Sequence, residues 1–416
     1  MTEQTPDAGP LGVLATYRRT PPAVKAILAG VFVGRLAGFL VIFLVVFLTH
    51  RGFTTGQAGF ALGVYGAGAV VGSFVGGWAT DRLSARAATA ISMLGTPVLI
   101  VSILYLKAYP LVVLAVFLVG TVGQLYRPAA QYLITELTPP SQLVMVTAMQ
   151  RLALNLGTTV TPLIGTALLS ISYSLLFWAE AVASVAYGLI ALVALPPRKK
   201  PVEATDGAPA PPRAGYRAVL SDWRYLFFLA AVFFITAVYT QYTASLPLAI
   251  VESGLSLWWY SAVVSLNAVI VATCEVLATR WVQTWPMRVT ALSGFGLVAI
   301  GYTVYAIGIT PALLILGTII WTASEITGAP TTFAYPGMVA PVHLRGRYIG
   351  AMQTVFGLAN AIGPVLGLAI WAAAGNAVFA WAAGIAALST LCALIGMRLP
   401  GTTPSVVKEP VPEAAG

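Results

Sequence analysis

Charged side chains are scarce in this sequence. Asp, Glu, Lys and Arg make up 8% of the 416 residues, whereas 58% are hydrophobic, and the mean hydropathy is +0.88. A soluble domain needs a charged and polar surface around its apolar core, and this composition does not supply one. The chain is therefore predicted to be a membrane protein with many spans.

Cysteine and histidine are scarcer still, with two of each. Cys274 and Cys392 both fall in apolar stretches, so they give neither a disulfide framework nor a zinc-ligand spacing, and each is expected to be a small buried hydrophobe. His50 and His343 fall in predicted loops. No Walker loop, nucleophile elbow or carboxylate dyad occurs, which argues against an ATP-driven pump or an intramembrane hydrolase. We expect no enzyme activity, no cofactor and no metal site.

Twelve long apolar stretches follow one another with short polar breaks. A helix of about 20 apolar residues crosses a hydrocarbon core of about 30 Å. The stretches cover residues 26–49, 57–79, 88–107, 110–134, 143–169, 173–195, 223–250, 258–279, 288–308, 311–335, 347–373 and 376–397. The sequence therefore predicts an all-α membrane protein of twelve transmembrane helices.

The basic residues alternate between the two sides of these spans. Only Arg51 and Lys107 fall in one set of loops. The other set and the tails hold Arg18, Arg19, Lys25, Arg82, Arg86, Arg198, Lys199, Lys200, Arg213, Arg217, Arg224, Arg280, Arg288, Arg345, Arg347, Arg398 and Lys408. Because cytoplasmic loops are enriched in Lys and Arg, both termini are predicted to be cytoplasmic, in a bacterial inner (plasma) membrane. Charges scattered over loops do not indicate a nucleic-acid partner.

A polar stretch rich in Pro and Ala splits the spans six and six. The predicted units are an N-terminal six-helix bundle (1–195), a flexible cytoplasmic linker (196–222), a C-terminal six-helix bundle (223–400) and a disordered cytoplasmic tail (401–416). Sequence features recur between the bundles at a separation of 202 or 203 residues. These pairs are Pro128 with Pro330, Met149 with Met352, and Pro162 with Pro364. A duplicated six-span unit is a common architecture of secondary transporters.

The loop after the second span resembles a motif of the major facilitator superfamily, G-x-x-x-D-[RK]-x-G-[RK]-[RK]. Gly77, Asp81, Arg82 and Arg86 match it, and Ser84 and Ala85 depart from it. Within that superfamily, "YRPAAQYLITELTPP", "YTQYTASLPL", "ASEITGAP" and "RGRYIG" are similar to twelve-span bacterial drug:proton antiporters. The antiporter motif of span five survives in part at Pro162 and Gly165, and a fuller version lies in span eleven at Gly363 and Pro364. The resemblance implies a monomer in the bilayer that exchanges a small-molecule substrate for protons.

Three charged residues inside the spans are candidates for proton coupling. Glu325 lies about 21 Å from the outer end of its span at 1.5 Å per residue, a depth at which an ionised carboxylate is costly. It matches the coupling Glu of the antiporters that the chain resembles, although a permanently hydrogen-bonded structural Glu is the alternative. Arg35 could pair with Glu325, attract an anionic part of a substrate, or serve structurally. Glu180 could belong to a proton relay. The other carboxylates near span ends, Glu136, Glu252 and Glu275, are expected to be solvated or to pair at a gate.

Gating is expected to involve the loop motif and the small residues of the moving helices. Asp81 is predicted to bind the N-terminus of span eleven or to pair with Arg127 when the cytoplasmic side is closed. Arg82 and Arg86 are expected chiefly to anchor the loop to the membrane surface. The predicted gating set is Gly77, Asp81, Arg82, Arg86, Arg127, Pro162, Gly165, Gly363 and Pro364.

Aromatic residues suggest the substrate. Tyr239, Gln241 and Tyr242 of the seventh span are predicted to line a central cavity together with Tyr126 and Trp321, and such rings bind flat or cationic amphiphiles. Trp258 and Trp259 are better explained as interfacial residues. The sequence thus favours a proton-coupled exporter of drugs or other amphiphiles. A transporter of one sugar, amino acid or peptide, with a polar cavity, is the alternative, and a non-transporting membrane sensor is a further one.

Overall fold

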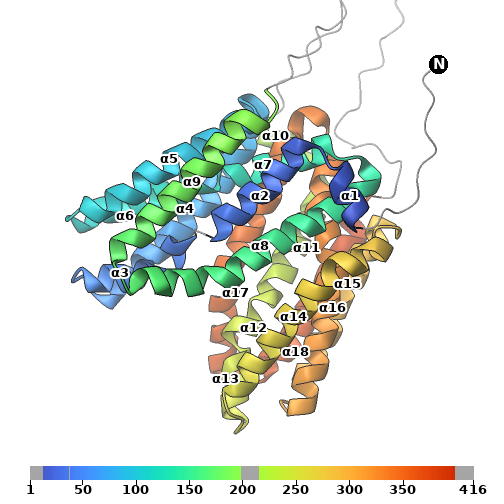
Figure 1. Ribbon diagram of the computed structural model, residues 1–416. Coiled ribbons are helices and arrows are strands. Elements are labelled where there is room, and N and C mark those ends of the chain that lie inside the picture. The colour runs from blue at the N-terminus through green and yellow to red at the C-terminus, as the bar shows by residue number, and fades with distance from the viewer. Residues whose placement is uncertain (1–12, 37, 198–214, 399–416) are drawn as a thin grey trace, which may run out of the picture.

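The computed structural model describes residues 13–36, 38–197 and 215–398, which form α-helices, one short 3-10 helix and connecting loops (Figure 1). The twelve predicted spans are confirmed, because twelve helices or broken helices of this part of the chain are long and apolar enough to cross a membrane. In lipid a helix satisfies its own backbone hydrogen bonds, which is why apolar stretches of this length adopt it.

The first six spans form the N-terminal bundle. They are α2 (Pro22–Leu36) with α3 (Phe39–His50), α4 (Thr55–Arg82), α5 (Ala85–Tyr105), α6 (Tyr109–Gln124) with α7 (Tyr126–Leu137), α8 (Pro140–Leu169) and α9 (Tyr173–Ala194). A short helix, α1 (Val13–Arg19), precedes them.

The last six spans form the C-terminal bundle. They are α11 (Trp223–Tyr239) with α12 (Gln241–Ala244) and α13 (Leu246–Glu252), α14 (Trp258–Val282), α15 (Met287–Ile307), α16 (Pro311–Val339), α17 (Arg345–Ala374) and α18 (Ala377–Gly396). The 3-10 helix η1 (Val342–Leu344) precedes α17, and α10 (Tyr216–Ser221) precedes α11.

Three of the spans are broken, and two of the breaks have a proline as their cause. Pro128, the third residue of α7, cannot donate to the carbonyl of Gln124, where α6 ends. Pro247 likewise lies just after the start of α13 and cannot donate to the carbonyl of Thr243 in α12. The break in the first span lies between α2 and α3, at Gly38. Broken helices place backbone polar groups and side chains at mid-membrane depth.

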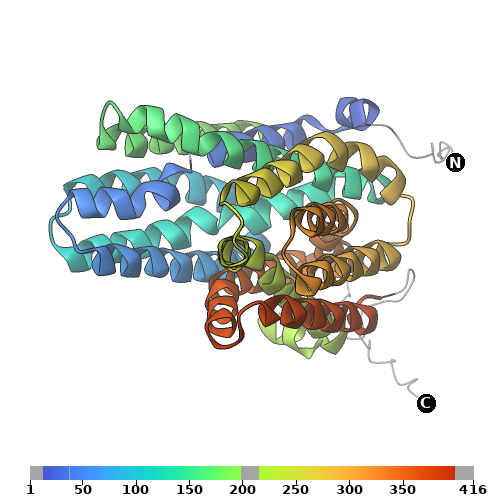
Figure 2. The ribbon, with the colours of Figure 1, turned by 90° about the horizontal axis from the view of Figure 1, so that it is seen from below.

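The two bundles lie side by side (Figure 2). Two helix pairs in corresponding positions of the two halves form contacts between them. The second span, α4, packs against the eleventh, α17, and the fifth, α8, packs against the eighth, α14. We call the end of the molecule that carries Arg82, Arg86, Arg345 and Arg347 the basic end. The bundles meet there and diverge toward the opposite end (Figure 1).

Part of the predicted linker is ordered rather than flexible. Residues 216–221 form α10, and the ring of Tyr216 stacks on Phe74 of α4 with the ring centroids 3.9 Å apart. The Tyr216 hydroxyl donates to the carbonyl of Phe74, and burial raises its pKa above the ordinary value, so it remains a donor. The stacking of the Tyr216 ring on Phe74 of the N-terminal bundle explains why this part of the linker is ordered. The predicted tail, 401–416, lies outside the described residues.

One expectation about the cysteines is wrong. Cys392 is buried, but Cys274 on α14 is exposed. An apolar face that looks toward lipid does not need to be covered by protein, so an apolar span does not guarantee a buried thiol.

Candidate functional site

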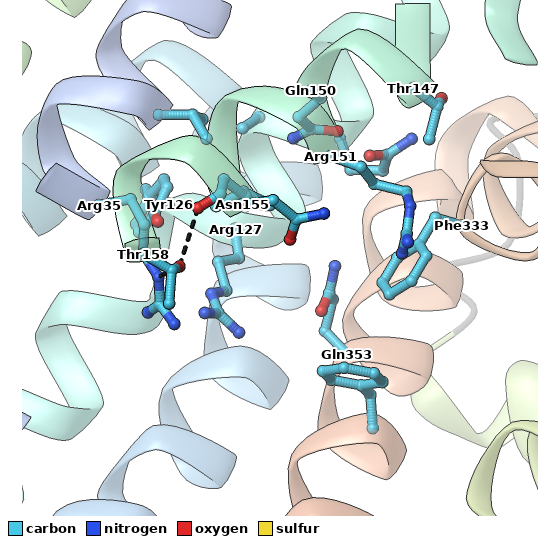
Figure 3. A pocket seen from close by; sticks show the side chains of 15 residues that line it. Arg35, Tyr126, Arg127, Thr147, Gln150, Arg151, Asn155, Thr158, Phe333 and Gln353 are labelled. Carbon is cyan, nitrogen blue, oxygen red and sulfur yellow. Dashed lines mark hydrogen bonds between the residues drawn. The ribbon is translucent and has the colours of Figure 1, made fainter. Parts of the chain in front are cut away.

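A cavity of about 220 Å³ lies between the bundles (Figure 3). Helices α2, α7 and α8 supply most of its wall, and α16 and α17 close it from the other bundle. Its lining residues are Val31, Arg35, Tyr126, Arg127, Ala130, Gln131, Thr147, Gln150, Arg151, Leu154, Asn155, Thr158, Phe333, Gln353 and Phe356. Three arginines and several amides therefore face one space inside the membrane domain.

Two further cavities adjoin this one and share lining residues with it. One of about 160 Å³ includes Arg151, Glu325 and Phe333, and one of about 320 Å³ includes Asn155 and Glu325. Their walls in the C-terminal bundle include the aromatic residues Tyr239, Tyr242, Trp321, Phe333 and Phe356. Together the cavities have the polar and aromatic lining that small-molecule sites usually show.

Arg151 joins the two bundles inside the membrane. It lies on α8 and binds two carboxylates of the C-terminal bundle: its Nε is 2.6 Å from Oε1 of Glu275 on α14, and its Nη2 is 2.9 Å from Oε1 of Glu325 on α16. Asn267 donates from Nδ2 to the second oxygen of Glu325 at 3.3 Å. A planar guanidinium can serve two carboxylates at once, which a lysine ammonium does less well.

The two carboxylates differ in their access to water. The side chain of Glu275 is 0% exposed and its Oε2 has no hydrogen-bond partner in the described part of the chain, whereas that of Glu325 is 22% exposed and faces two of the cavities. A proton entering the cavity can therefore reach Glu325 directly. Glu275 is sealed behind Arg151.

Of the roles considered for Arg35, a pair with Glu325 is not found in the structure. Arg35 lies in the last turn of α2, where the helix dipole favours a cation, and its Nε donates to Thr158 Oγ1 at 2.7 Å. Glu325 is taken by Arg151 instead. The packing of α8 between α2 and the C-terminal bundle decides this, because α8 lies between the two groups.

Arg127 lies beside Arg35 in the cavity and not at the basic end (Figure 3). The predicted alternative of an Arg127 pair with Asp81 is therefore not found. Within the described residues, neither Arg35 nor Arg127 forms an ion pair with a carboxylate.

Glu180 lies at the break in the first span. Its Oε2 accepts the backbone N–H of Leu40 at 2.7 Å, at the start of α3. A carboxylate at a helix N-terminus is stabilised by the unpaired N–H groups there. This contact gives Glu180 a structural task, and its part in a proton relay stays a prediction.

Four of the five predicted cavity residues line a cavity. Tyr126 faces the first cavity, and Tyr239, Tyr242 and Trp321 face the third. Gln241 does not, and this expectation is wrong. Its side chain is fully buried, with Nε2 donating to the carbonyl of Gly363 at 2.9 Å. The break after Tyr239 turns Gln241 toward α17 instead of the cavity.

Asp81 binds the N-terminus of α17 across the bundle interface. Its two carboxylate oxygens accept the backbone N–H of Gly346 at 2.7 Å and of Arg347 at 3.0 Å, and Arg347 Nη1 lies 3.1 Å from Oδ2. This is the first of the two partners proposed from the sequence. The unpaired N–H groups and the positive dipole end of a helix make it a site for a carboxylate.

Glycines bring α4 and α17 into close contact beside Asp81. A Cβ atom on Gly77 would lie 2.6 Å from the carbonyl oxygen of Gly346 and 2.9 Å from Cα of Gly350. Only glycine fits this approach. Arg86, expected to anchor the loop to the membrane surface, instead donates to the carbonyl of Leu192 on α9. Arg82 is in the last turn of α4.

The other predicted gating residues lie within long helices. Pro162 is inside α8 and Pro364 inside α17. Gly165 faces the rings of Phe39 and Phe43, and Gly363 packs on Thr240 and Ala237 of the broken seventh span. Their part in gating stays a prediction.

Arg151 is not among the site residues that the sequence predicts, and Glu275 lies deeper in its helix than the sequence predicts. Arg151 directly follows the repeated Met-Gln pair, at a position where the second repeat has Thr354, so a charge in one copy only was the available signal. Glu275 was assigned to a span end. The structure extends α14 to Val282 and covers Glu275 with α8 from the other bundle.

Within the described residues, no group of three or more His, Cys, Asp and Glu side chains is close enough to hold a metal ion. The arrangement offers instead a cavity at the interface of two bundles, a buried ion-pair network across it, and a charged contact that holds the basic end together.

Comparisons with known proteins agree with this architecture. The chain is 22% identical over 325 residues to the uncharacterized MFS-type transporter YqjV of Bacillus subtilis (strain 168), covering 76% of this chain and 78% of that protein. Its fold is similar to that of the human organic anion transporter MFSD10, with a TM-score of 0.70, 16% identity, and coverage of 90% of this chain and 100% of that one. It is also similar to the transporter FucP in the outward conformation, with a TM-score of 0.70, 14% identity, and coverage of 90% and 98%.

The sequence model of the Major Facilitator Superfamily matches residues 27–364, well over half of the chain. The chain is therefore a multi-pass membrane transporter that belongs to the Major Facilitator Superfamily.

Proposed function

We propose that this transporter is a proton-coupled secondary exporter of amphiphilic small molecules. The observation that carries the proposal is the pairing of Arg151 on one bundle with Glu275 and Glu325 on the other, inside a cavity between them. Charges at this depth are costly unless they are paired. Protonation of one of the two carboxylates therefore changes the attraction between the bundles.

Glu325 is the proton-binding residue in this proposal. A protonated Glu325 is neutral and no longer forms an ion pair with Arg151. Arg151 then remains paired with Glu275 alone. One ion pair across the interface is then lost, which alters the balance between the two packings of the bundles. A ligand or proton shifts such an equilibrium only through its different affinity for the two states, and this network supplies that difference.

The structure has the geometry of one of these states. Hydrogen bonds and ion pairs join the bundles through Tyr216 and Asp81 at the basic end and through Arg151 in the cavity. If the basic end is cytoplasmic, as the distribution of Arg and Lys favours, the cavity opens to the outside in this state. Opening of the basic end would then require Asp81 to leave α17.

The available driving force is sufficient for export. One proton moving through about 100 mV yields about 2.3 kcal/mol, and one pH unit adds about 1.4 kcal/mol. The sum of about 3.7 kcal/mol supports a gradient of several hundred-fold for a neutral substrate. The aromatic residues Tyr239, Tyr242 and Trp321 are the proposed surface for the apolar part of the substrate.

A transporter of one polar metabolite is the second candidate. The lining of the first cavity by Gln131, Gln150, Asn155 and Gln353 favours it, because amides give directional hydrogen bonds. Among the structural neighbours, XylE is named as a proton:xylose symporter, with a TM-score of 0.67, 12% identity, and coverage of 88% of this chain and 94% of that one. A panel of sugars, amino acids and amphiphiles separates the two candidates.

The test is Glu325→Gln in proteoliposomes with an imposed pH gradient. Uphill movement of the compounds that the parent transports is expected to be lost, because the amide cannot exchange a proton, while exchange without a gradient persists. Glu252→Gln is the matched control, since Glu252 is an exposed carboxylate at the end of α13, away from the cavities. Uphill transport by Glu325→Gln at the parent rate contradicts the proposal.

A further inference from the structure

Two arginines of the cavity, Arg35 and Arg127, have no role in the proton-coupled network. Both line the 220 Å³ cavity from the N-terminal bundle, side by side (Figure 3). Two cations together in a space of low dielectric repel each other, and each pays for leaving water. Such a pair needs a compensating negative charge.

The carboxylates of the region do not supply that charge by contact. Glu275 and Glu325 are bound by Arg151, and Glu180 is bound to the backbone N–H of Leu40. The guanidinium of Arg35 donates one hydrogen bond, to the hydroxyl of Thr158, and the guanidinium of Arg127 donates none to a described residue. The guanidinium groups thus retain most of their donors for a ligand.

Neutral donors around the arginines are also unused. Gln131 is 2% exposed and Thr147 is fully buried, yet Gln131 Nε2 and Thr147 Oγ1 have no hydrogen-bond partner in the described part of the chain. Both line the same cavity, and Gln150 and Asn155 line it beside them. Buried polar groups are normally satisfied, so unpaired ones in a cavity indicate a ligand that satisfies them.

Aromatic side chains of the C-terminal bundle line the first cavity and the two cavities that adjoin it. Tyr242 stacks on Trp321 with ring centroids 5.4 Å apart, and Phe333 contacts Phe356 edge to face at 5.4 Å. The adjoining cavities therefore have two arginines on the N-terminal bundle and aromatic rings on the C-terminal bundle. A molecule that fills them best carries a negative charge at one end and a flat apolar body at the other.

We propose that the substrate is an amphiphilic organic anion whose carboxylate or equivalent acidic group binds between Arg35 and Arg127 while its ring system lies on the aromatic side chains of the C-terminal bundle. This inference names the substrate class for the proposed transport function and rests on it. Aromatic residues alone suggested flat or cationic amphiphiles. Two arginines in the cavity without a carboxylate bound to them favour an anion instead.

The test compares three probes with one ring system: 1-naphthoate, 1-naphthamide and trimethyl(1-naphthylmethyl)ammonium. Equilibrium binding of each to the purified full chain in nanodiscs is measured without a proton gradient, and binding to empty nanodiscs is subtracted. The parent is expected to bind 1-naphthoate at least about tenfold more tightly than 1-naphthamide, since hydrogen bonds to charged groups exceed neutral ones by about that factor. The ammonium probe is expected to bind weakest.

Substitutions identify the residues responsible. Arg35→Gln and Arg127→Gln should each remove most of the preference for the anion and leave the affinity for 1-naphthamide within about twofold, which also shows that the variants fold. Arg35→Lys should keep part of the preference for the anion. Arg217→Gln is the control for total charge, because Arg217 is exposed on α10 and should have no effect.

Three results overturn the inference: no binding of 1-naphthoate to the parent, tighter binding of the ammonium probe, or an anion preference that survives both Gln substitutions. Failure of the proposed function looks different. If only the proposed function fails, Glu325→Gln keeps uphill transport. The parent still prefers the anion, and Arg127→Gln still removes that preference.

Discussion

Asp81→Asn is expected to weaken the closed contact at the basic end. Asp81 is 4% exposed and accepts the backbone N–H groups of Gly346 and Arg347 as well as the guanidinium of Arg347. Asn keeps one acceptor oxygen, loses the charge and presents an NH2 group to one of these donors. Hydrogen bonds to charged groups contribute about 1.5–3 kcal/mol each and neutral ones about 0.5–1.5 kcal/mol. We expect a loss of about 2 kcal/mol, or a shift of about 30-fold in the ratio of closed to open basic ends.

Cysteine accessibility measures this shift. Ala130 lines the cavity and is buried in the closed state, so Ala130→Cys reports whether reagent reaches the cavity from the basic end. The background is a chain with Cys274→Ser and Cys392→Ala. Labelling by the impermeant thiol reagent MTSET in inside-out vesicles, where a cytoplasmic basic end faces the medium, should become many-fold faster in Asp81→Asn.

Asp222→Asn is the matched control. Asp222 is a buried carboxylate near the same end, but its partners Tyr225, Tyr348 and Arg398 all belong to the C-terminal bundle. Its loss should lower thermal stability without opening the basic end. Equal labelling rates in Asp81→Asn and the parent, or equal acceleration by Asp222→Asn, would refute the reasoning.

Two further predictions concern buried groups. Arg151→Gln should lower the thermal stability of the purified protein by the equivalent of about 3–5 kcal/mol, because Glu275 is left buried without a partner, and Arg151→Gln with Glu275→Gln should recover most of the loss; equal stability of the single and double variants would show that the pair is not coupled. Gln241→Leu should lower thermal stability by about 1–3 kcal/mol while leaving substrate affinity within about twofold, because the side chain bonds helices rather than substrate; a large change in affinity at unchanged stability would return Gln241 to the cavity.

The sequence predicted the membrane spans well because the hydrophobicity of a segment is a local property. Hydrophobic length defines a transmembrane helix, and the recurrence of Pro128 and Pro162 at Pro330 and Pro364 is visible without coordinates. For Asp81 the sequence left two partners open, and the structure shows the first of them, the N-terminus of α17, which is a general site for a carboxylate. The sequence did not predict the short helix α10 within the expected linker.

The central site could be predicted only in part. Mid-membrane charges mark functional positions, so Glu325 and Arg35 were found from depth alone. The sequence does not show which charged side chains contact each other. Glu325 pairs with Arg151 on the fifth span and Arg35 lies with Arg127 on the fourth, and neither pairing leaves a periodic or compositional signal.

The sequence by itself determined that this chain crosses the membrane twelve times as two related bundles, because hydrophobic length and the placement of basic residues act on each segment separately. Only the tertiary structure decided which polar groups share the space between the bundles. That choice depends on how α8 and α17 rotate and pack against the opposite bundle, which buries Glu275 and Gln241 and leaves Arg35 and Arg127 facing the cavity. In lipid, apolar surface does not fix a helix's rotation, so close packing and the pairing of buried polar groups do.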